Sequence, residues 1–219
     1  MQYYIIVIQD YLFHLNNNYK LSSFRKTMDE GVEPFAHWDK PSWDEYFMSM
    51  ALLVSTRSMD GSNKQGCVIV GKDKKVLSLG YNGPPKGSLD KEIPLTERPY
   101  KYLLMEHAEL NALHNRQFAI EGSTLYVTSM PCVNCLRSVL QAGVSRVVHG
   151  PFKSRAISTI DEEAMEMMMR GRDNTFKIEE FQGQMLKCID RAKDYYNIKS
   201  EIVRKRNEEE NKDSDKLKQ

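Results

Sequence analysis

The chain has 219 residues, of which 28% are charged and 41% hydrophobic, and its formal net charge is +1. This length favours one domain with appendages over two domains. The near-neutral charge argues against a polyanion binder, and the four cysteines are too sparse for a disulfide scaffold. The apolar start, MQYYIIVIQDYLF, is too short to span a bilayer and lacks the basic leader of a signal peptide. A soluble, reducing, cytoplasmic setting without membrane contact is therefore expected.

The two ends of the chain differ from its middle. Residues 1–41 are predicted to be an N-terminal extension, because the stretch contains the polar run HLNNNYK and is broken by glycine and proline. Residues 204–219, RKRNEEENKDSDKLKQ, contain almost no apolar side chains and are predicted to be a disordered charged tail. Residues 42–203 then form the predicted domain.

Within the domain, turn signals separate periodic segments. A helix is expected from Ser42, where an N-cap serine precedes apolar residues at helical spacing. Residues 67–83 read as a hairpin, and residues 84–99 as a long proline-rich loop of the kind that is often functional. Beyond the loop, helices are expected at 107–116, 132–143, 161–171 and 183–198, and strands at 123–130, 145–150 and 175–181. This alternation indicates an α/β fold in which helices cover both faces of a mixed sheet.

Two short motifs carry chemistry. His107, in EHAELNAL, could by itself be a structural or merely exposed histidine. Cys132 and Cys135, in PCVNC, could by themselves be a redox pair, half of a zinc knuckle or a chance pairing. A thioredoxin-like pair would also follow a strand and open a helix, so the cysteines alone do not decide between these alternatives.

The combination of the motifs is far more specific. H-x-E followed by P-C-x-x-C is the signature of zinc-dependent nucleobase deaminases. His107, Cys132 and Cys135 supply three protein ligands and leave a fourth position for water, as in a catalytic site. Helix N-termini favour the thiolate form of the cysteines. Glu109 is then the expected acid and base, which takes a proton from water and returns it to the substrate.

Residues 43 to about 150 resemble the deoxycytidylate (dCMP) deaminase family. The resemblance rests on WDEYFMSMALLVSTRSMDGSNKQGCVIVG, GYNGPPKGS, HAELNA and LQAGVSRVV, in addition to the zinc motif. It implies the cytidine-deaminase-like fold, a three-layer α/β/α sandwich with a mixed five-stranded sheet. It also implies hydrolysis of dCMP to dUMP and ammonia, which supplies dUMP for thymidylate synthesis.

The resemblance assigns residues to substrate binding as well. Asn82 of GYNG would bond the deoxynucleotide, and the backbone of Ala108 would touch the pyrimidine edge. Asn111 is typical of the family, and Arg57 and Ser58 are candidates near the phosphate. Asn82 is also a plausible turn residue, Asn111 a plausible helix-surface residue and Arg57 a plausible solvated one.

The sequence departs from the family at three places. Phe152 stands where members commonly have a tyrosine near the phosphate, and Lys153 or Arg155 could compensate. The loop between Val68 and Glu106 has no cysteine or histidine for a second zinc, so one zinc per chain is expected. The loop PPKGSLDKE differs from the common one, which puts a regulatory nucleotide site, with its dCTP and dTTP effectors and accompanying Mg²⁺, in question.

Several alternatives stay open at this point. A dCTP or bifunctional dCMP/dCTP deaminase would use the same zinc chemistry. Three alternatives are less favoured: a tRNA adenosine deaminase, a riboflavin-pathway deaminase and a catalytically silent nucleotide-binding subunit. The charge and the GYNG motif argue against a nucleic-acid partner. Analogy with the family implies a homo-oligomer, often a hexamer.

Overall fold

The computed structural model describes residues 39–88, 92–94, 97–152, 158–172 and 175–216. The chain divides by internal contacts into Met1–Lys40 and Pro41–Gln219, a division one residue away from the predicted end of the extension. Most of that extension, residues 1–38, lies outside the described residues.

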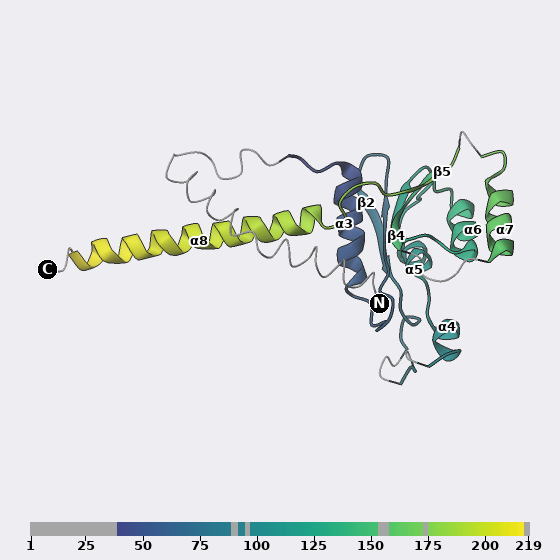
Figure 1. Cartoon of the computed structure of the whole chain (residues 1–219), viewed down its shortest axis with the longest axis horizontal. Coiled ribbons are helices and arrows are strands. Elements are labelled where there is room, and N and C mark those ends of the chain that lie inside the picture. The colour runs from purple at the N-terminus through teal and green to yellow at the C-terminus, as the bar shows by residue number, and fades with distance from the viewer. Residues whose placement is uncertain (1–38, 89–91, 95–96, 153–157, 173–174, 217–219) are drawn as a thin grey trace. The chain divides into compact units, whose positions relative to one another are not determined.

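The described residues form alternating helices and strands (Figure 1). The strands are β1 (Gly66–Val70), β2 (Val76–Tyr81), β3 (Thr124–Ser129), β4 (Arg146–Phe152) and β5 (Lys177–Glu180). The helices are α3 (Trp43–Ser55), α4 (Tyr100–Leu104), α5 (Ala108–Asn115), α6 (Val133–Gln141), α7 (Thr159–Met169) and α8 (Lys187–Lys216).

The strands make one five-stranded sheet in the order β2-β1-β3-β4-β5. β1 pairs antiparallel with both β2 and β3, whereas β3, β4 and β5 run parallel. β1 and β2 form an antiparallel hairpin, whereas the parallel strands β3, β4 and β5 are joined through helices, as parallel neighbours must be. The prediction of a mixed five-stranded sheet is confirmed.

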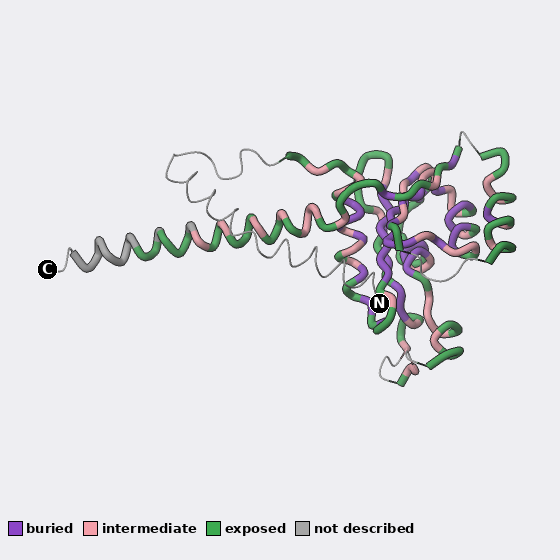
Figure 2. Tube along the Cα trace, in the orientation of Figure 1, coloured by how far each residue is buried: buried purple, intermediate pink, exposed green. Residues whose placement is uncertain are grey.

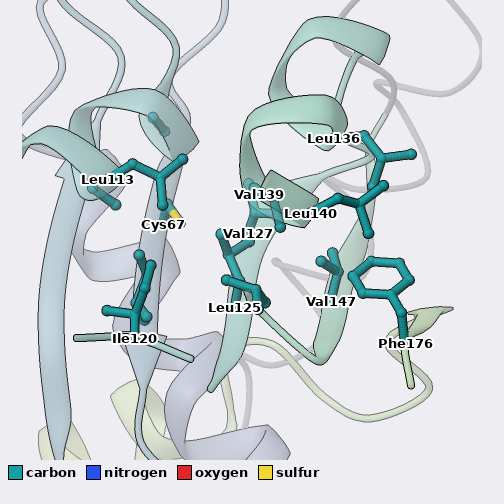
Figure 3. Packing of buried hydrophobic residues seen from close by; sticks show 14 of the residues in the cluster. Cys67, Leu113, Ile120, Leu125, Val127, Leu136, Val139, Leu140, Val147 and Phe176 are labelled. Carbon is teal, nitrogen blue, oxygen red and sulfur yellow. The ribbon is translucent and has the colours of Figure 1, made fainter. Parts of the chain in front are cut away.

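The sheet separates two hydrophobic cores, because successive side chains of a strand point to opposite faces. One core, which includes Leu125, Val127 and Val147, packs under α5, α6 and α7 (Figure 3). The other, which includes Val68, Tyr126 and Val148, packs under α3. Figure 2 shows the buried residues concentrated in the strands and on the inner faces of these helices. The three-layer α/β/α sandwich is therefore confirmed.

Two glycines let helices approach the sheet closely from opposite sides. A Cβ on Gly66 would lie 2.0 Å from the carbonyl oxygen of Ala51 in α3. A Cβ on Gly80 would lie 2.2 Å from the carbonyl oxygen of Ala108 and 2.3 Å from the amide nitrogen of Ala112, both in α5. Any side chain at either position would push a helix away from the sheet.

The helix starts follow their sequence signals. Ser42 caps α3, and its hydroxyl accepts a hydrogen bond from the amide of Glu45, whose carboxylate accepts one from the amide of Ser42. Ser158 and Asp161 make the same reciprocal capping box at the start of α7. None of the helices formed by the described residues has the length and apolar character needed to cross a membrane.

One prediction about local structure was wrong, and one short helix was missed. The tail predicted to be disordered from residue 204 continues α8 as far as Lys216. Charged residues with good helix propensity form this segment, and opposite charges four residues apart support it, as in Arg204–Glu208 at 3.2 Å and Glu201–Lys205 at 3.9 Å. In addition, the residues directly after the proline-rich loop form the short helix α4, which the sequence analysis did not predict.

Candidate metal centre

The two sequence motifs occupy the starts of two neighbouring helices. His107 is the N-cap residue of α5, and Cys132 is the N-cap residue of α6, directly after β3. Cys135 lies three residues further on, within the first turn of α6, and therefore on the same side as Cys132. The fold thus brings His107 close to two cysteines that lie 25 and 28 positions further along the chain, as the sequence predicted.

The ligand atoms of these residues lie at a spacing that suits zinc. The Nδ1 atom of His107 is 3.5 Å from Sγ of Cys132 and 3.3 Å from Sγ of Cys135, and all three atoms lie within 4.8 Å of one another. Ligands of a tetrahedral zinc ion with bonds of about 2.0–2.3 Å are separated by roughly 3.5 Å. One imidazole and two thiolates are also the ligand types that zinc prefers, so the residues present fit a zinc ion.

The electrostatics of the cluster favour a bound cation. The hydrogen bond from Cys135, followed by that from His107, lowers the pKa of Cys132 to about 3, so this sulfur is a thiolate. The same hydrogen bond to Cys132, together with burial, raises the pKa of Cys135. The hydrogen bond to Cys132 raises the pKa of His107. The proton therefore resides on Cys135, and a metal ion that bound both sulfurs would displace it.

Glu109 lies beside the cluster in an enclosed position. It is the second residue of α5, and only 5% of its surface is exposed. Burial raises the pKa of its carboxyl group above the ordinary value, with the nearby Cys132 thiolate contributing in the same direction. A carboxyl group with a raised pKa can accept and return a proton near neutral pH, which is the property that a general acid and base requires.

The residues predicted to bind substrate have mixed environments. Asn82 is buried, and its side chain accepts a hydrogen bond from the amide of Gln65 at 2.7 Å and donates one to the carbonyl oxygen of Asn63 at 2.9 Å. Ser58 is also buried, and its hydroxyl donates to the carbonyl oxygen of Asn82 at 2.7 Å. Both side chains hold loops together in this structure, and their contact with substrate stays a prediction.

The other candidates range from fully buried, at Ala108, to exposed, at Arg57. Ala108 is the first residue of α5, where the backbone amide has no partner within the helix. The side-chain amide of Asn111 donates to the carbonyl oxygen of Tyr81 at 2.8 Å and so ties α5 to the end of β2. Arg57 and Phe152 are exposed. Lys153 and Arg155 lie outside the described residues.

A buried polar network beside the metal cluster was not predicted. Gln65 is its centre and bonds the end of β3 as well as Asn82. Asp60 accepts from the amides of Ser62 and Asn63, and its carboxylate pairs at 2.7 Å with Lys101 of α4. These polar residues fall in a loop that the sequence shows only as a helix break, and nothing in their spacing signals that they become buried.

The fold and the cluster together define a class of protein. A mixed sheet that presents His-x-Glu at one helix start and Cys-x-x-Cys at the next is the arrangement of a zinc-dependent deaminase. The chain belongs to the family described as the cytidine and deoxycytidylate deaminase zinc-binding region, whose profile matches residues 41–151, just over half of its length.

Named relatives point to one branch of this family. The deoxycytidylate deaminases of Mus musculus and Homo sapiens are 38% and 36% identical to the chain, each over 116 residues, or 50% of this chain. The chain spans 65% of the length of each of these two relatives. The crystal structure of dCMP deaminase from the cyanophage S-TIM5, in complex with dCMP and dUMP, matches with a TM-score of 0.51 and 27% identity, covering 66% of this chain and all of that one.

Proposed function

We propose that the protein is a dCMP deaminase, which hydrolyses dCMP to dUMP and ammonia and so supplies dUMP for thymidylate synthesis. The observation that carries the proposal is the cluster of His107, Cys132 and Cys135 with Glu109 buried two residues after the histidine. The likeness to deoxycytidylate deaminases over half of the chain supports this substrate over other cytosine compounds.

In this proposal His107, Cys132 and Cys135 hold one zinc ion. Zinc, when bound, polarises water and lowers its pKa toward about 7, which makes a nucleophile available at neutral pH. A cytoplasmic location belongs to the same proposal, because two of the ligands must stay reduced thiolates. None of the four cysteines, all of which are described, forms a disulfide.

Glu109 moves the protons of the reaction. Its carboxylate accepts a proton from the attacking water, whose oxygen bonds to C4 of the cytosine ring. Glu109 delivers that proton to ring nitrogen N3, then accepts the remaining proton from the new hydroxyl group on C4 and delivers it to the amino group. The bond between C4 and that nitrogen breaks, ammonia leaves, and the C4 carbonyl of dUMP remains. The raised pKa of Glu109 suits both halves of this cycle.

Substrate recognition is assigned to the residues around the cluster. The amide of Ala108 would meet the pyrimidine edge, because it opens α5 between His107 and Glu109. Asn82 and Asn111 would bond the sugar or ring. Arg57, with Ser58 beside it, would face the phosphate, since its side chain is exposed directly after α3. A charge-assisted bond to phosphate contributes about 1.5–3 kcal/mol, or roughly ten- to a hundredfold in affinity.

The proposal extends to assembly and control. Assembly as a homo-oligomer, specifically a hexamer, and control by dCTP and dTTP with Mg²⁺ are the features implied by the sequence resemblance. Sedimentation of the full chain would test the assembly, and dCMP kinetics with each triphosphate would test the control. Hyperbolic kinetics that neither triphosphate changes would contradict regulation without affecting the proposed reaction.

The test of the reaction is release of ammonia from a panel of cytosine compounds. Purified zinc-loaded protein should deaminate dCMP at least about tenfold faster, in kcat/KM, than deoxycytidine, because only the nucleotide offers a phosphate contact. dCTP belongs in the panel, because a dCTP or bifunctional enzyme would use the same cluster. The Glu109→Gln protein is the control for contaminating deaminases. Equal rates on dCMP and deoxycytidine would refute the nucleotide assignment.

A further inference from the structure

We propose that Gln65 is a positioning residue that holds the two ligand-bearing segments of the metal centre in register. This inference rests on the zinc site of the proposed function, but it concerns a side chain that is not itself a ligand. Gln65 lies directly before β1 and is 8% exposed. Its hydrogen bonds reach toward the cysteine segment on one side and toward the histidine segment on the other.

On the cysteine side, the side-chain oxygen of Gln65 accepts two hydrogen bonds from the end of β3. The hydroxyl of Ser129 donates to it at 2.7 Å, and the hydroxyl of Thr128 donates to it as well. The Thr128 hydroxyl also accepts from the amide of Gly66 at 3.1 Å. Only Met130 and Pro131 separate this anchored end from Cys132. The position of the first thiolate is therefore set within three residues of Gln65's contacts.

On the histidine side, Gln65 acts through its backbone. Its amide donates to the side-chain oxygen of Asn82 at 2.7 Å, and its carbonyl oxygen accepts from the amide of Asn82 at 3.1 Å. The next residue, Gly83, exchanges two hydrogen bonds with Glu106, at 3.1 and 2.8 Å. His107 follows Glu106 directly. Both ligand segments are thus connected to Gln65 by short chains of hydrogen bonds.

The chemistry of the glutamine side chain suits this position. Its oxygen can accept two bonds at once, and its nitrogen donates to the side-chain oxygen of Asn63 at 2.5 Å. The hydroxyl-bearing partners are buried, with Thr128 2% and Ser129 3% exposed. Loss of the acceptor would leave two buried hydroxyl groups to find other partners, which is unfavourable in a site that excludes water. A shift of β3's end is the expected way to relieve that cost.

The experiment measures the metal rather than the reaction. Gln65→Met keeps the length of the side chain and removes its hydrogen bonds. Zinc affinity of the full-length protein would be measured by competition with a chromophoric chelator, and the geometry of the site by the visible spectrum of the Co²⁺-substituted protein. We expect zinc affinity to fall about 10–100-fold, as for other outer partners of metal ligands, and the Co²⁺ bands to change.

The matched control is Ser49→Ala. Ser49 is also buried, and its hydroxyl donates to the carbonyl oxygen of Met185 at 2.7 Å, but it lies on α3, across the sheet from the metal cluster. This variant should lose stability without a change in zinc affinity or in the Co²⁺ spectrum. The control therefore separates a general loss of stability from a displaced metal site.

A folded Gln65→Met protein with zinc affinity within about twofold of the wild type and an unchanged Co²⁺ spectrum would overturn the inference. If that variant does not fold, Ser129→Ala is the test, because it removes one of the two hydrogen bonds to the side-chain oxygen of Gln65. This variant should bind zinc several-fold more weakly, and unchanged zinc binding would again overturn the inference. A wild-type protein that binds zinc but does not deaminate dCMP would refute the proposed function and leave this inference intact, because neither readout uses substrate.

Discussion

The two faces of the sheet each carry a polar cluster, and the clusters differ in how far their charges are satisfied. At the starts of α5 and α6, His107, Cys132, Cys135 and Glu109 lie close together, and each has a perturbed pKa. Under α3, by contrast, Arg146 sits between carboxylates that neutralise it. The first cluster is incomplete, because its charges are not all paired, and it can bind a cation. The second cluster is complete, because its charges are already paired, and it stabilises the fold.

The complete cluster joins four elements. Arg146 of β4 donates two hydrogen bonds to Asp44 of α3, at 2.8 and 2.7 Å, and one to Glu179 of β5 at 2.6 Å. The hydroxyl of Tyr126 in β3 donates to Asp44 at 2.7 Å. A pocket of about 690 Å³ opens here and is lined by these charged groups. Because the groups are already paired with one another, we assign the pocket no ligand.

The sharpest test of this contrast is Glu109→Gln. The change keeps the size of the side chain and removes its ability to shuttle protons. We expect kcat to fall at least about a hundredfold, the low end for general acid–base catalysis, with zinc content and melting temperature retained. Glu179→Gln on the other face is the matched control and should leave kcat unchanged. Near-normal turnover of Glu109→Gln would remove the assigned role.

The second test removes a metal ligand. Cys132→Ser replaces the thiolate with a hydroxyl group that binds zinc weakly, so zinc affinity should fall more than about a hundredfold, beyond the effect of outer partners. Stability should fall as well, since metal binding is coupled to folding. Cys188→Ser, at a cysteine outside the cluster, should keep the metal content of the wild type. Metal analysis that gives equal zinc in both variants would contradict the assignment.

The third test breaks the complete cluster. Arg146→Met removes the hydrogen bonds to Asp44 and Glu179 while preserving much of the side-chain volume. Because these groups are partly exposed and screened by solvent, we expect the free energy of unfolding to fall by only about 1–3 kcal/mol. Chemical denaturation would measure this loss, and kcat per bound zinc should not change. A large loss of kcat in this variant would show that the two faces are not independent.

The last test is the pH dependence of the same cluster. Hydrogen bonds from Arg146 hold the pKa of Asp44 below its ordinary value near 3.8. A carboxyl group whose pKa is lower in the folded state stabilises the protein fully above its unfolded pKa and loses that contribution as pH falls through the folded pKa. Unfolding measured below about pH 4 should therefore show a shallower loss of stability in Arg146→Met than in the wild type. Parallel curves for the two proteins would contradict this origin of the acid sensitivity.

The candidate metal site could be proposed from sequence because the chemistry of a zinc site constrains both residue type and spacing. His107, Glu109, Cys132 and Cys135 stand in two short motifs, and the fold places both at helix starts, as expected. The strands and most helices were also predictable, because the helices have an apolar stripe and the central strands are short apolar runs that pack into both cores. These features depend on local patterns that remain visible in a single sequence.

Two features could not be predicted: the contacts of Gln65, which join residues distant in sequence, and the far end of α8, whose sequence has no apolar periodicity. Gln65 meets Ser129 across 64 positions, and no local signal marks that pairing. The far end of α8 has almost no apolar residues in its sequence, so helix propensity and ion pairs such as Arg204–Glu208 support it in place of an apolar stripe. The polar composition that suggested disorder is equally compatible with an exposed helix.

The two glycines under α3 and α5 bring the backbones of these helices into direct contact with the backbone of the sheet. Gly66 and Gly80 lie on adjacent strands, one register position apart, and each admits a helix backbone to its own face. Here the backbones of α3, the sheet and α5 lie in close contact, with almost no side chains between them. Side chains can absorb a small displacement by changing rotamer, but bare backbone cannot. The start of α5, which carries His107 and Glu109, therefore packs backbone against backbone, and its position cannot adjust through small changes of rotamer.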